Sequence, residues 1–419
     1  MGAQPGMHTA CNSILTISGG SSSIQFALFA VSRSAVPCRV VRTIILFVTF
    51  ALCGATAAQA EEDHRAWQHG IDLIRVGERL LLVWGSAGNP PQPNPGGDWP
   101  HDVYYAWLDP SADHGRAPLD PQTLVSRPEA QEPPSVAINA RGTVLMTSED
   151  GNGGINQHAG LWDSSLHVLR AYPITIRRGG HSGHVAALGE RFLVVYGEGW
   201  VNGAGWRGLG TGERIYARVI GADGTLAPEV KLTPDGLAHP RDSWPLVAGS
   251  ERNWLAVWQR YPDLTLQSAL IGASGAVMAR RQIATGLPLR YAYAVDYAPQ
   301  LAAYVVAGTS GEAGFASLVN LDGDILRTAH GLPPMASESR IVLGLDGTQQ
   351  IGVYPVRPRG VAVIRFSREA IDLVKVIDHP HVWDYAGTTG LFVAPGKLLF
   401  ATLSTSGLRL ISIDLRLRD

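Results

Sequence analysis

The sequence predicts an all-β fold, a seven-bladed β-propeller made of four-stranded antiparallel blades. Short strands rich in β-branched and aromatic residues recur at intervals of roughly 48 to 63 residues, which is the range of propeller blades. Tight turns that contain Gly, Asp or Pro separate these strands. The 419 residues include 48 glycines and 27 prolines. We find no long helical pattern, so this composition favours many short strands and turns.

One complete repeat lies between Arg177 and Thr233. Its four predicted strands, which suit an up-and-down antiparallel sheet, are His184–Leu188, Phe192–Tyr196, Arg214–Ile220 and Glu229–Leu232. Turns at Gly189-Glu190 and Ala222-Asp223-Gly224 join the first strand to the second and the third to the fourth. The repeat is therefore a single blade.

The second strand of this blade has six counterparts elsewhere in the chain. They are Leu80–Trp84, Val144–Thr147, Trp254–Trp258, Leu301–Val305, Gln350–Tyr354 and Leu398–Ala401. The last repeat ends after its third strand, so we expect the segment around His64–His69 to supply its outer strand and close the ring. A ring of six or eight blades and a pair of β-sandwiches are the alternatives.

The repeat resembles a pattern that is common in secreted bacterial propellers, in which P-x-V-A precedes L-V-V-W, I-Y-A-R and D-G. Here the pattern stands as Pro134-Ser135-Val136-Ala137, Leu255-Ala256-Val257-Trp258, Ile215-Tyr216-Ala217-Arg218 and Asp223-Gly224. The resemblance covers the whole of residues 61–419. It implies a structure and no fixed activity.

Residues 41–60 have the pattern of a secretory signal peptide. Arg39 and Arg42 precede the apolar run Thr43–Cys53, and Ala58-Gln59-Ala60 follows it. A buried strand is the alternative. We therefore expect an exported protein, periplasmic or secreted, whose mature propeller (residues 61–419) has no membrane span. All three cysteines precede the cleavage site, so the mature chain would contain no disulfide.

Residues 1–40 do not fit a propeller. The stretch Ile14–Phe29 resembles the opening strand-turn-strand of acetate kinases, with Ser18 where that family usually has Asn and Gln25 where Lys is common. The resemblance ends after this stretch. We interpret residues 1–40 as a fused gene fragment or the result of a misplaced start codon, and we expect them to be disordered.

Charge and motifs exclude several classes of function. The formal net charge is −2, which gives no basic patch for nucleic acid. The chain contains no G-x-S-x-G, Walker or dinucleotide-binding motif. We expect a monomer without a cofactor. His181 and His184 could form a metal pair, but hydrogen bonding or proton transfer suits their place at a strand start better. Ser148–Gly154 partly matches a calcium loop without its closing glutamate, so we interpret it as a turn.

The candidate site lies on one face of the ring. The loops between second and third strands and the connections between blades share this face, and the long loops Ser86–His101 and Gly197–Gly212 are there. Because the starts of the inner strands converge on the axis, distant residues become neighbours. The predicted ligand-binding residues are Glu132, Trp200, Trp206, Asp242, Trp244, Tyr293, Glu338, Trp383, Asp384 and Tyr385.

Polar and aromatic side chains around one funnel suit a saccharide or another ligand of the cell envelope. The alternative is a carbohydrate-active enzyme. The layout resembles seven-bladed propeller polysaccharide lyases in architecture, and the candidate catalytic residues for β-elimination are His181, His184, Arg241, Tyr291 and Arg340, with Tyr293 as a second tyrosine. A glycoside hydrolase would need two carboxylates, for which Glu132, Asp242, Glu338 and Asp384 are candidates.

Overall fold

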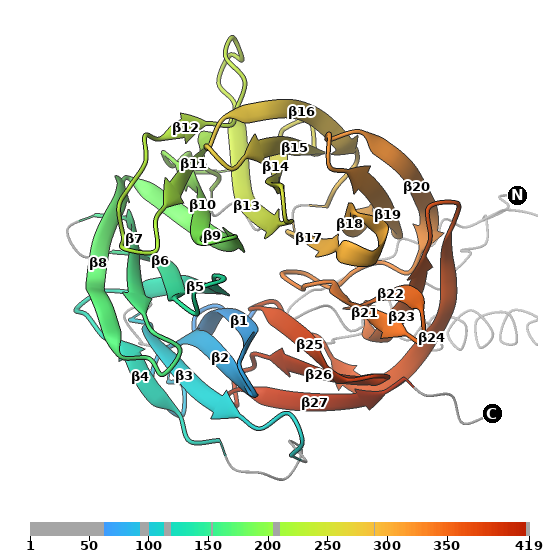
Figure 1. Ribbon diagram of the computed structural model, residues 1–419, viewed down its shortest axis with the longest axis horizontal. Coiled ribbons are helices and arrows are strands. Elements are labelled where there is room, and N and C mark those ends of the chain that lie inside the picture. The colour runs from blue at the N-terminus through green and yellow to red at the C-terminus, as the bar shows by residue number, and fades with distance from the viewer. Residues whose placement is uncertain are drawn as a thin grey trace, which may run out of the picture. The chain divides into compact units, whose positions relative to one another are not determined.

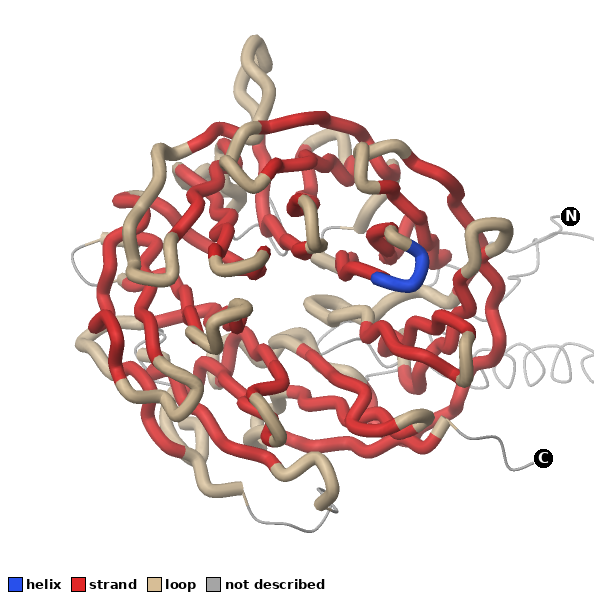
Figure 2. The backbone as a smooth tube through the Cα atoms, viewed as in Figure 1, coloured by secondary structure: helices blue, strands red, loops and turns tan. Residues whose placement is uncertain are grey.

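The computed structural model describes residues 63–92, 100–112, 119–151, 154–203, 210–288 and 290–415. In these residues, seven antiparallel sheets stand around a central axis (Figure 1). Strands and the loops between them form almost the whole ring (Figure 2). The predicted all-β seven-bladed propeller is confirmed. The predicted N-terminal extension, the signal peptide and the three cysteines lie outside the described residues.

Each blade runs from the axis outwards. The inner strands are β1 (Gln68–Val76), β5 (Gln131–Ile138), β9 (Gly180–Leu188), β13 (Arg241–Gly249), β17 (Tyr293–Ala298), β21 (Val342–Asp346) and β25 (Thr388–Ala394). The second strands are β2 (Arg79–Ser86), β6 (Val144–Asp150), β10 (Arg191–Glu198), β14 (Asn253–Tyr261), β18 (Ala303–Ser310), β22 (Gln349–Pro355) and β26 (Lys397–Thr402).

The outer half of each blade is more variable. The third strands are β3 (Asp102–Leu108), β7 (Asn156–Trp162), β11 (Arg214–Ile220), β15 (Thr265–Gly272), β19 (Ala313–Asn320), β23 (Arg359–Phe366) and β27 (Arg409–Asp414). The outer strands are β4 (Gln122–Val125), β8 (Val168–Arg178), β12 (Val230–Lys231), β16 (Val277–Ala284), β20 (Ile325–Leu332) and β24 (Ile371–Val382). A short 3₁₀ helix, η2 (Pro299–Leu301), joins β17 to β18.

The second strands are apolar throughout because neighbouring blades cover both of their faces. In β10, Leu193 and Val195 pack with Trp254 and Trp258 of the following blade. On the opposite face, Phe192, Val194 and Tyr196 pack with residues of the preceding blade such as Leu145 and Leu161. A strand that is buried on both faces loses the alternation of polar and apolar residues. The continuous apolar runs that identified the blades are therefore the packing surfaces between them.

The expected closure of the ring by an outer strand at His64–His69 is wrong. In the described residues, the seventh sheet has three strands, β25, β26 and β27. The segment before β1 instead runs beside the axis, where the amide of His64 donates to the carbonyl of Tyr385 (3.1 Å) and the amide of Gly70 donates to Ala386 (2.9 Å). Contacts between the innermost parts of blades one and seven thus join the two ends of the ring.

Several inner strands begin with a residue in the left-handed region of backbone space. Ser182, Trp244, Tyr291 and Glu338 have φ values of 52°, 53°, 51° and 45°. Non-glycine residues seldom adopt this conformation, and it costs on the order of 1 to 3 kcal/mol. Here it bends the chain from the connection between blades into the strand. This bend brings polar and aromatic side chains to the axis.

In the described residues, no helix has both the length and the apolar character needed to cross a membrane.

Close packing between blades predicts that Gly249→Ala destabilises the protein. Gly249 ends β13, and a Cβ atom there would overlap the backbone carbonyl of Ala187 in β9. We expect a loss of about 1 to 3 kcal/mol in the free energy of unfolding, since the backbone must move to make room. Urea unfolding of the purified protein measures this value.

Gly272→Ala is the matched control. Gly272 ends β15, and its added methyl group would meet the sulfur of Met278 at 3.1 Å, the flexible end of a side chain that is 57% exposed. We expect a change within about 0.5 kcal/mol. Equal effects of the two substitutions would contradict the proposed clash between blades three and four.

Candidate functional site

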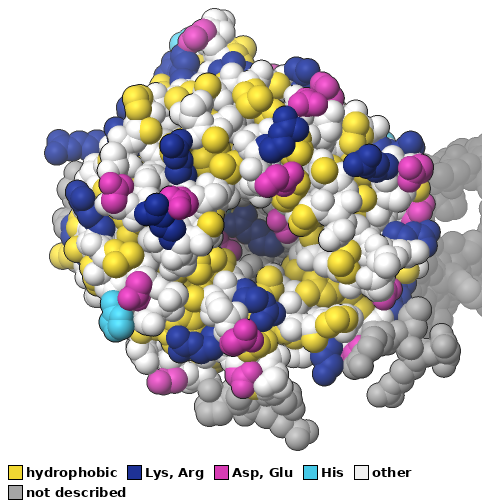
Figure 3. Space-filling view, viewed as in Figure 1, with side chains coloured by type: hydrophobic (Ala, Val, Ile, Leu, Met, Phe, Trp, Pro, Cys, Tyr) yellow, Lys and Arg dark blue, Asp and Glu magenta, His cyan; other side chains and the backbone are white. Residues whose placement is uncertain are grey.

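A cavity of about 150 Å³ lies at the starts of the inner strands. We call it the entrance cavity. Its walls come from blades one to four, the turn before β17 and the loop between β10 and β11, and its lining residues are Arg65, His69, Glu132, Glu149, His181, Ser182, Trp200, Gly210, Thr211, Gly212, Ser243, Trp244 and Tyr291. Figure 3 shows one face of the ring, which is hollowed at its centre and has basic side chains in the hollow.

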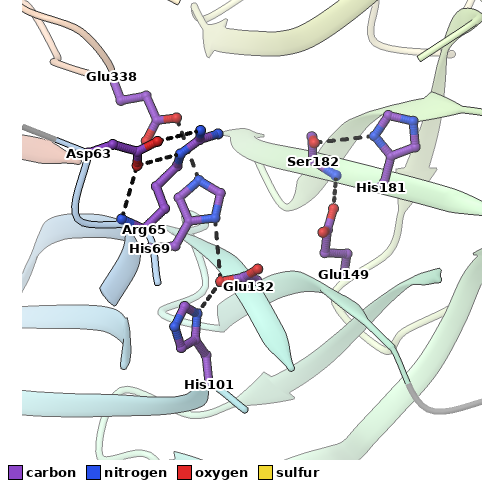
Figure 4. Close-up of polar contacts among 9 residues, drawn as sticks. All are labelled: Asp63, Arg65, His69, His101, Glu132, Glu149, His181, Ser182 and Glu338. Atoms are coloured by element: carbon purple, nitrogen blue, oxygen red, sulfur yellow. Dashed lines mark hydrogen bonds and ion pairs between the residues drawn. The ribbon is translucent and has the colours of Figure 1, made fainter. Parts of the chain in front are cut away.

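His69 is a charged, buried group at the axis. Its Nδ1 atom lies 3.4 Å from Glu132 and its Nε2 atom lies 3.5 Å from Glu338 (Figure 4). Burial alone would lower the pKa of His69, but the two carboxylates raise that pKa to about 10. The imidazolium therefore joins blade one to blade two and to the connection before blade six.

Glu132 is held ionised by its neighbours. It pairs with His69 and forms a short contact with His101, which is fully buried. Although burial favours the neutral acid, His101 and His69 lower the pKa of Glu132 to about 2. Glu132 is thus a fixed negative charge in the wall of the cavity.

Glu149, in contrast to Glu132, tends to keep its proton. It is the cross-strand partner of Glu132 in the pairing of β5 with β6, so the two side chains stand on the same face. One oxygen of Glu149 accepts a hydrogen bond from the amide of Ser182 (2.6 Å). Burial and the charge of Glu132 raise the pKa of Glu149 to about 7. Two adjacent carboxyl groups therefore differ in protonation near neutral pH.

Arg65 adds a second cation, which has its own counter-ion. Its guanidinium donates two hydrogen bonds to Asp63 (3.0 and 2.9 Å) and lies 4.4 Å over the ring centre of Tyr385. The segment beside the axis therefore contributes two positive charges to this region, Arg65 and His69.

Trp244 forms the floor of the entrance cavity. Its ring stacks with Tyr291 (5.0 Å between centres, 13° between planes) and with His69 (5.6 Å, 18°), while the edge of His184 approaches it at 5.3 Å. Beyond Trp244 lies a second cavity of about 20 Å³, which we call the axial cavity. Trp244 lines both cavities and so separates them.

Trp200 forms the outer wall of the entrance cavity. Its side chain is 48% exposed, and its ring meets the edge of His181 at 5.4 Å. His181 is buried and bonds the carbonyl of Gly199 (2.8 Å), and burial lowers the pKa of His181 to about 4. Thr211 is 1% exposed, and within the described part of the chain its hydroxyl has no hydrogen-bond partner. A large apolar ring, a neutral histidine and an unsatisfied hydroxyl thus lie together.

The structure places the predicted site residues in three groups. Glu132, His181, Trp200, Trp244 and Tyr291 line the entrance cavity. His184, Tyr293, Glu338 and Arg340 line the axial cavity, on the other side of Trp244. His181 and His184 therefore lie in different cavities, although two residues separate them in the sequence.

The remaining predicted residues have other positions. Asp242 is fully buried in an ion pair with Arg260 (2.7 Å), and the Nε1 atom of Trp383 donates to the carbonyl of Gly360 (2.7 Å) in a core between blades. Arg241, Asp384 and Tyr385 lie beside neither cavity, and their contacts are with Asn202, His64 and Arg65 respectively. Trp206 lies outside the described residues.

Sequence analysis missed five residues of this region. Arg65 and His69 lie in the segment that was expected to be an outer strand, and His101 ends a loop that was noted only for its length. Glu149 lies in the stretch that was interpreted as a turn, although it belongs to β6. Thr211 has no sequence signal. The pairing of β5 with β6 could have identified Glu149, since it places this residue opposite a predicted site residue.

In the described residues, no group of three or more His, Cys, Asp or Glu side chains is arranged to hold a metal ion. Glu149 can give or take a proton near pH 7, Glu132 can stabilise a positive charge, and Trp200 can stack on an apolar ligand face.

The raised pKa of Glu149 predicts a fall in stability as pH rises. The folded state binds this proton more tightly than the unfolded chain, whose glutamate pKa is about 4.5, so stability decreases from about pH 4.5 to pH 7. We expect Glu149→Gln to remove this contribution, which amounts to about 3 kcal/mol in total. Urea unfolding of both proteins between pH 4 and pH 8 measures the difference.

Glu78→Gln in the exposed turn between β1 and β2 serves as the control. The free energy of unfolding of Glu78→Gln should depend on pH in the same way as that of the unchanged protein. Parallel profiles for Glu149→Gln and the unchanged protein would show that Glu149 does not hold its proton in the folded state.

No protein-family model matches the sequence, and neither does the sequence of any curated protein. Similar solved structures include a chain of the mitotic checkpoint complex (10% identity, 93% of this chain and 99% of that chain, TM-score 0.50). They also include the Trypanosoma rangeli sialidase in complex with the inhibitor DANA (10% identity, 84% of this chain and 55% of that chain, TM-score 0.42). A third is the SapL1 lectin in complex with alpha methyl fucoside (8% identity, 75% of this chain and 98% of that chain, TM-score 0.43). The chain matches about half the length of the sialidase. At these identities the likeness shows the propeller fold alone.

Proposed function

We propose that the protein is an exported propeller that binds a saccharide in the entrance cavity. The observation that carries this proposal is Trp200, a large ring that is 48% exposed and lines a cavity together with Glu132 and Glu149. Aromatic faces stack on the C–H face of a sugar ring, while hydroxyl groups need hydrogen-bond partners. Glu132, Glu149 and the hydroxyl of Thr211 offer such partners in the same cavity. Export rests on the sequence pattern of residues 41–60.

Trp200→Ala should weaken saccharide binding at least tenfold, because the stacking face is lost. The fold should not change, since Trp200 lies at the surface and its Nε1 atom donates to the side chain of Asn202 (2.9 Å) in the same loop. A glycan array with the purified protein identifies ligands, and calorimetry then measures the affinity of both proteins.

Trp107→Ala is the control for loss of a partly exposed tryptophan. Trp107 lies in β3 under the guanidinium of Arg79 (3.9 Å), on the outer half of blade one. The substitution Trp107→Ala should leave the affinity for the saccharide unchanged. Equal affinity of Trp200→Ala and the unchanged protein would contradict the proposal.

Hydrolysis of a glycoside is the second candidate function, favoured by the pair of Glu132 and Glu149. A proton donor beside an ionised carboxylate is the arrangement that glycosidases use, and cross-strand partners stand about 5 Å apart at Cβ. The polysaccharide lyase alternative has less support. Arg340 lines the axial cavity and Arg241 contacts Asn202, so neither lies with His181 and Tyr291.

If the pair is catalytic, incubation with the saccharides that bind should release reducing ends. Glu149→Gln should then lower the rate by roughly a hundredfold or more, since it removes the proton donor, while binding persists. Unsaturated ends that absorb ultraviolet light would instead indicate a lyase. Binding without any cleavage would leave the first function and exclude the second.

A further inference from the structure

We propose that the bound saccharide carries a protonated amine and that this amine lies against Glu149 and Glu132. The inference deepens the proposed function and rests on it. The two carboxyl groups stand side by side in the wall that also contains Trp200 and Thr211. A cation at this point would be a counter-ion for Glu149, while Glu132 already pairs with His69 and His101.

The charges around the cavity leave room for one more cation. Arg65 is matched by Asp63 through two hydrogen bonds. His69 is matched by Glu132 and Glu338. Glu132 is also in contact with His101, whose positive charge lowers the pKa of Glu132. With His101 counted, the positive and negative charges of these groups balance. An ionised Glu149 would add a further negative charge, and an ammonium group from the ligand would neutralise it.

The groups that face Glu149 come from four elements. Glu132 faces it from β5 and His69 from β1, while His101 lies behind Glu132. On β9, Ser182 donates its amide to the carboxyl group, and His181 is neutral because burial lowers its pKa. Asp150, the next residue along β6, pairs instead with Arg127 (2.7 Å). Among the described residues of β9, the only two basic side chains are His181 and His184, and burial lowers the pKa of both, so β9 supplies no cation beside Glu149.

Proton release follows from this arrangement. Below neutral pH the carboxyl group of Glu149 keeps its proton, because burial and Glu132 disfavour a second negative charge. When an ammonium group binds there, its positive charge stabilises the ionised carboxylate of Glu149, and the carboxyl proton is released to solvent. The affinity for the amine should therefore rise with pH up to about 7, whereas the affinity for a neutral sugar should not.

Trp200 and Thr211 orient the ligand. An exposed indole face attracts an ammonium group or a polarised C–H face, and Trp200 is the exposed indole of the cavity wall. The hydroxyl of Thr211 is 1% exposed and has no partner among the described residues. A buried hydroxyl without a partner costs on the order of 1 to 3 kcal/mol. A hydroxyl or amine of the ligand can supply that partner.

The experiment compares three ligands by calorimetry at pH 5.0 and pH 6.5, where the sugar amine keeps its proton. They are oligomers of glucosamine, of N-acetylglucosamine and of glucose, each measured in two buffers that differ in enthalpy of ionisation. We expect the glucosamine oligomer to bind about tenfold more tightly at pH 6.5 and to release close to one proton at pH 5.0. The two neutral oligomers should bind more weakly and without proton release.

Two variants test the residues. Glu149→Gln should abolish the pH dependence and the preference for the amine, while neutral oligomers still bind. Thr211→Val keeps the shape of the side chain and removes a buried hydroxyl without a partner among the described residues, so the melting temperature should rise while affinity for all oligomers falls about fivefold. Unchanged affinity in Thr211→Val would contradict the role of its hydroxyl.

The outcomes separate the inference from the function. Equal or tighter binding of the neutral oligomers, or no proton release with the amine, overturns the amine site and leaves saccharide binding intact. If neither these oligomers nor any saccharide on the array binds, the proposed function fails and the inference fails with it.

Discussion

The axial region depends on one buried cation. The imidazolium of His69 lies between Glu132 and Glu338, which come from different blades. A buried charge costs several kcal/mol unless partners surround it, so all three residues must keep their places together. Trp244 stacks on the same ring. The stacked position of Trp244 and the fixed negative charge of Glu132 therefore both depend on His69.

Backbone conformation prepares this arrangement. The left-handed φ values of Ser182, Trp244, Tyr291 and Glu338 occur where the connections between blades become inner strands. Each is a local cost that the surrounding sheet must outweigh. The strained backbone places the side chains and amides of the site: the amide of Ser182 faces Glu149, and the rings of Trp244 and Tyr291 stack on each other. Ser182, Trp244 and Tyr291 also line the entrance cavity, and Glu338 lines the axial cavity.

Sequence analysis predicted the fold because the packing between blades requires it. Strands such as β10 are buried on both faces, and this leaves continuous apolar runs at regular spacing. The convergence of the inner-strand starts could also be predicted, and four residues predicted on that ground line one cavity: Glu132, His181, Trp244 and Tyr291. Sequence analysis failed at the segment before β1, because an extended segment beside the axis and an outer strand look alike in sequence.

The function of an acidic residue could not be predicted from its position, since it depends on its partners. Asp242 and Glu149 are both acids at the axial ends of strands. Asp242 accepts two hydrogen bonds from Arg260 and one from Thr233, so its carboxyl group is paired within the protein. Glu149 has one backbone amide and a neighbouring carboxylate that opposes its ionisation. Only an acid in the second situation keeps a proton to exchange with a ligand, and only the folded chain distinguishes the two.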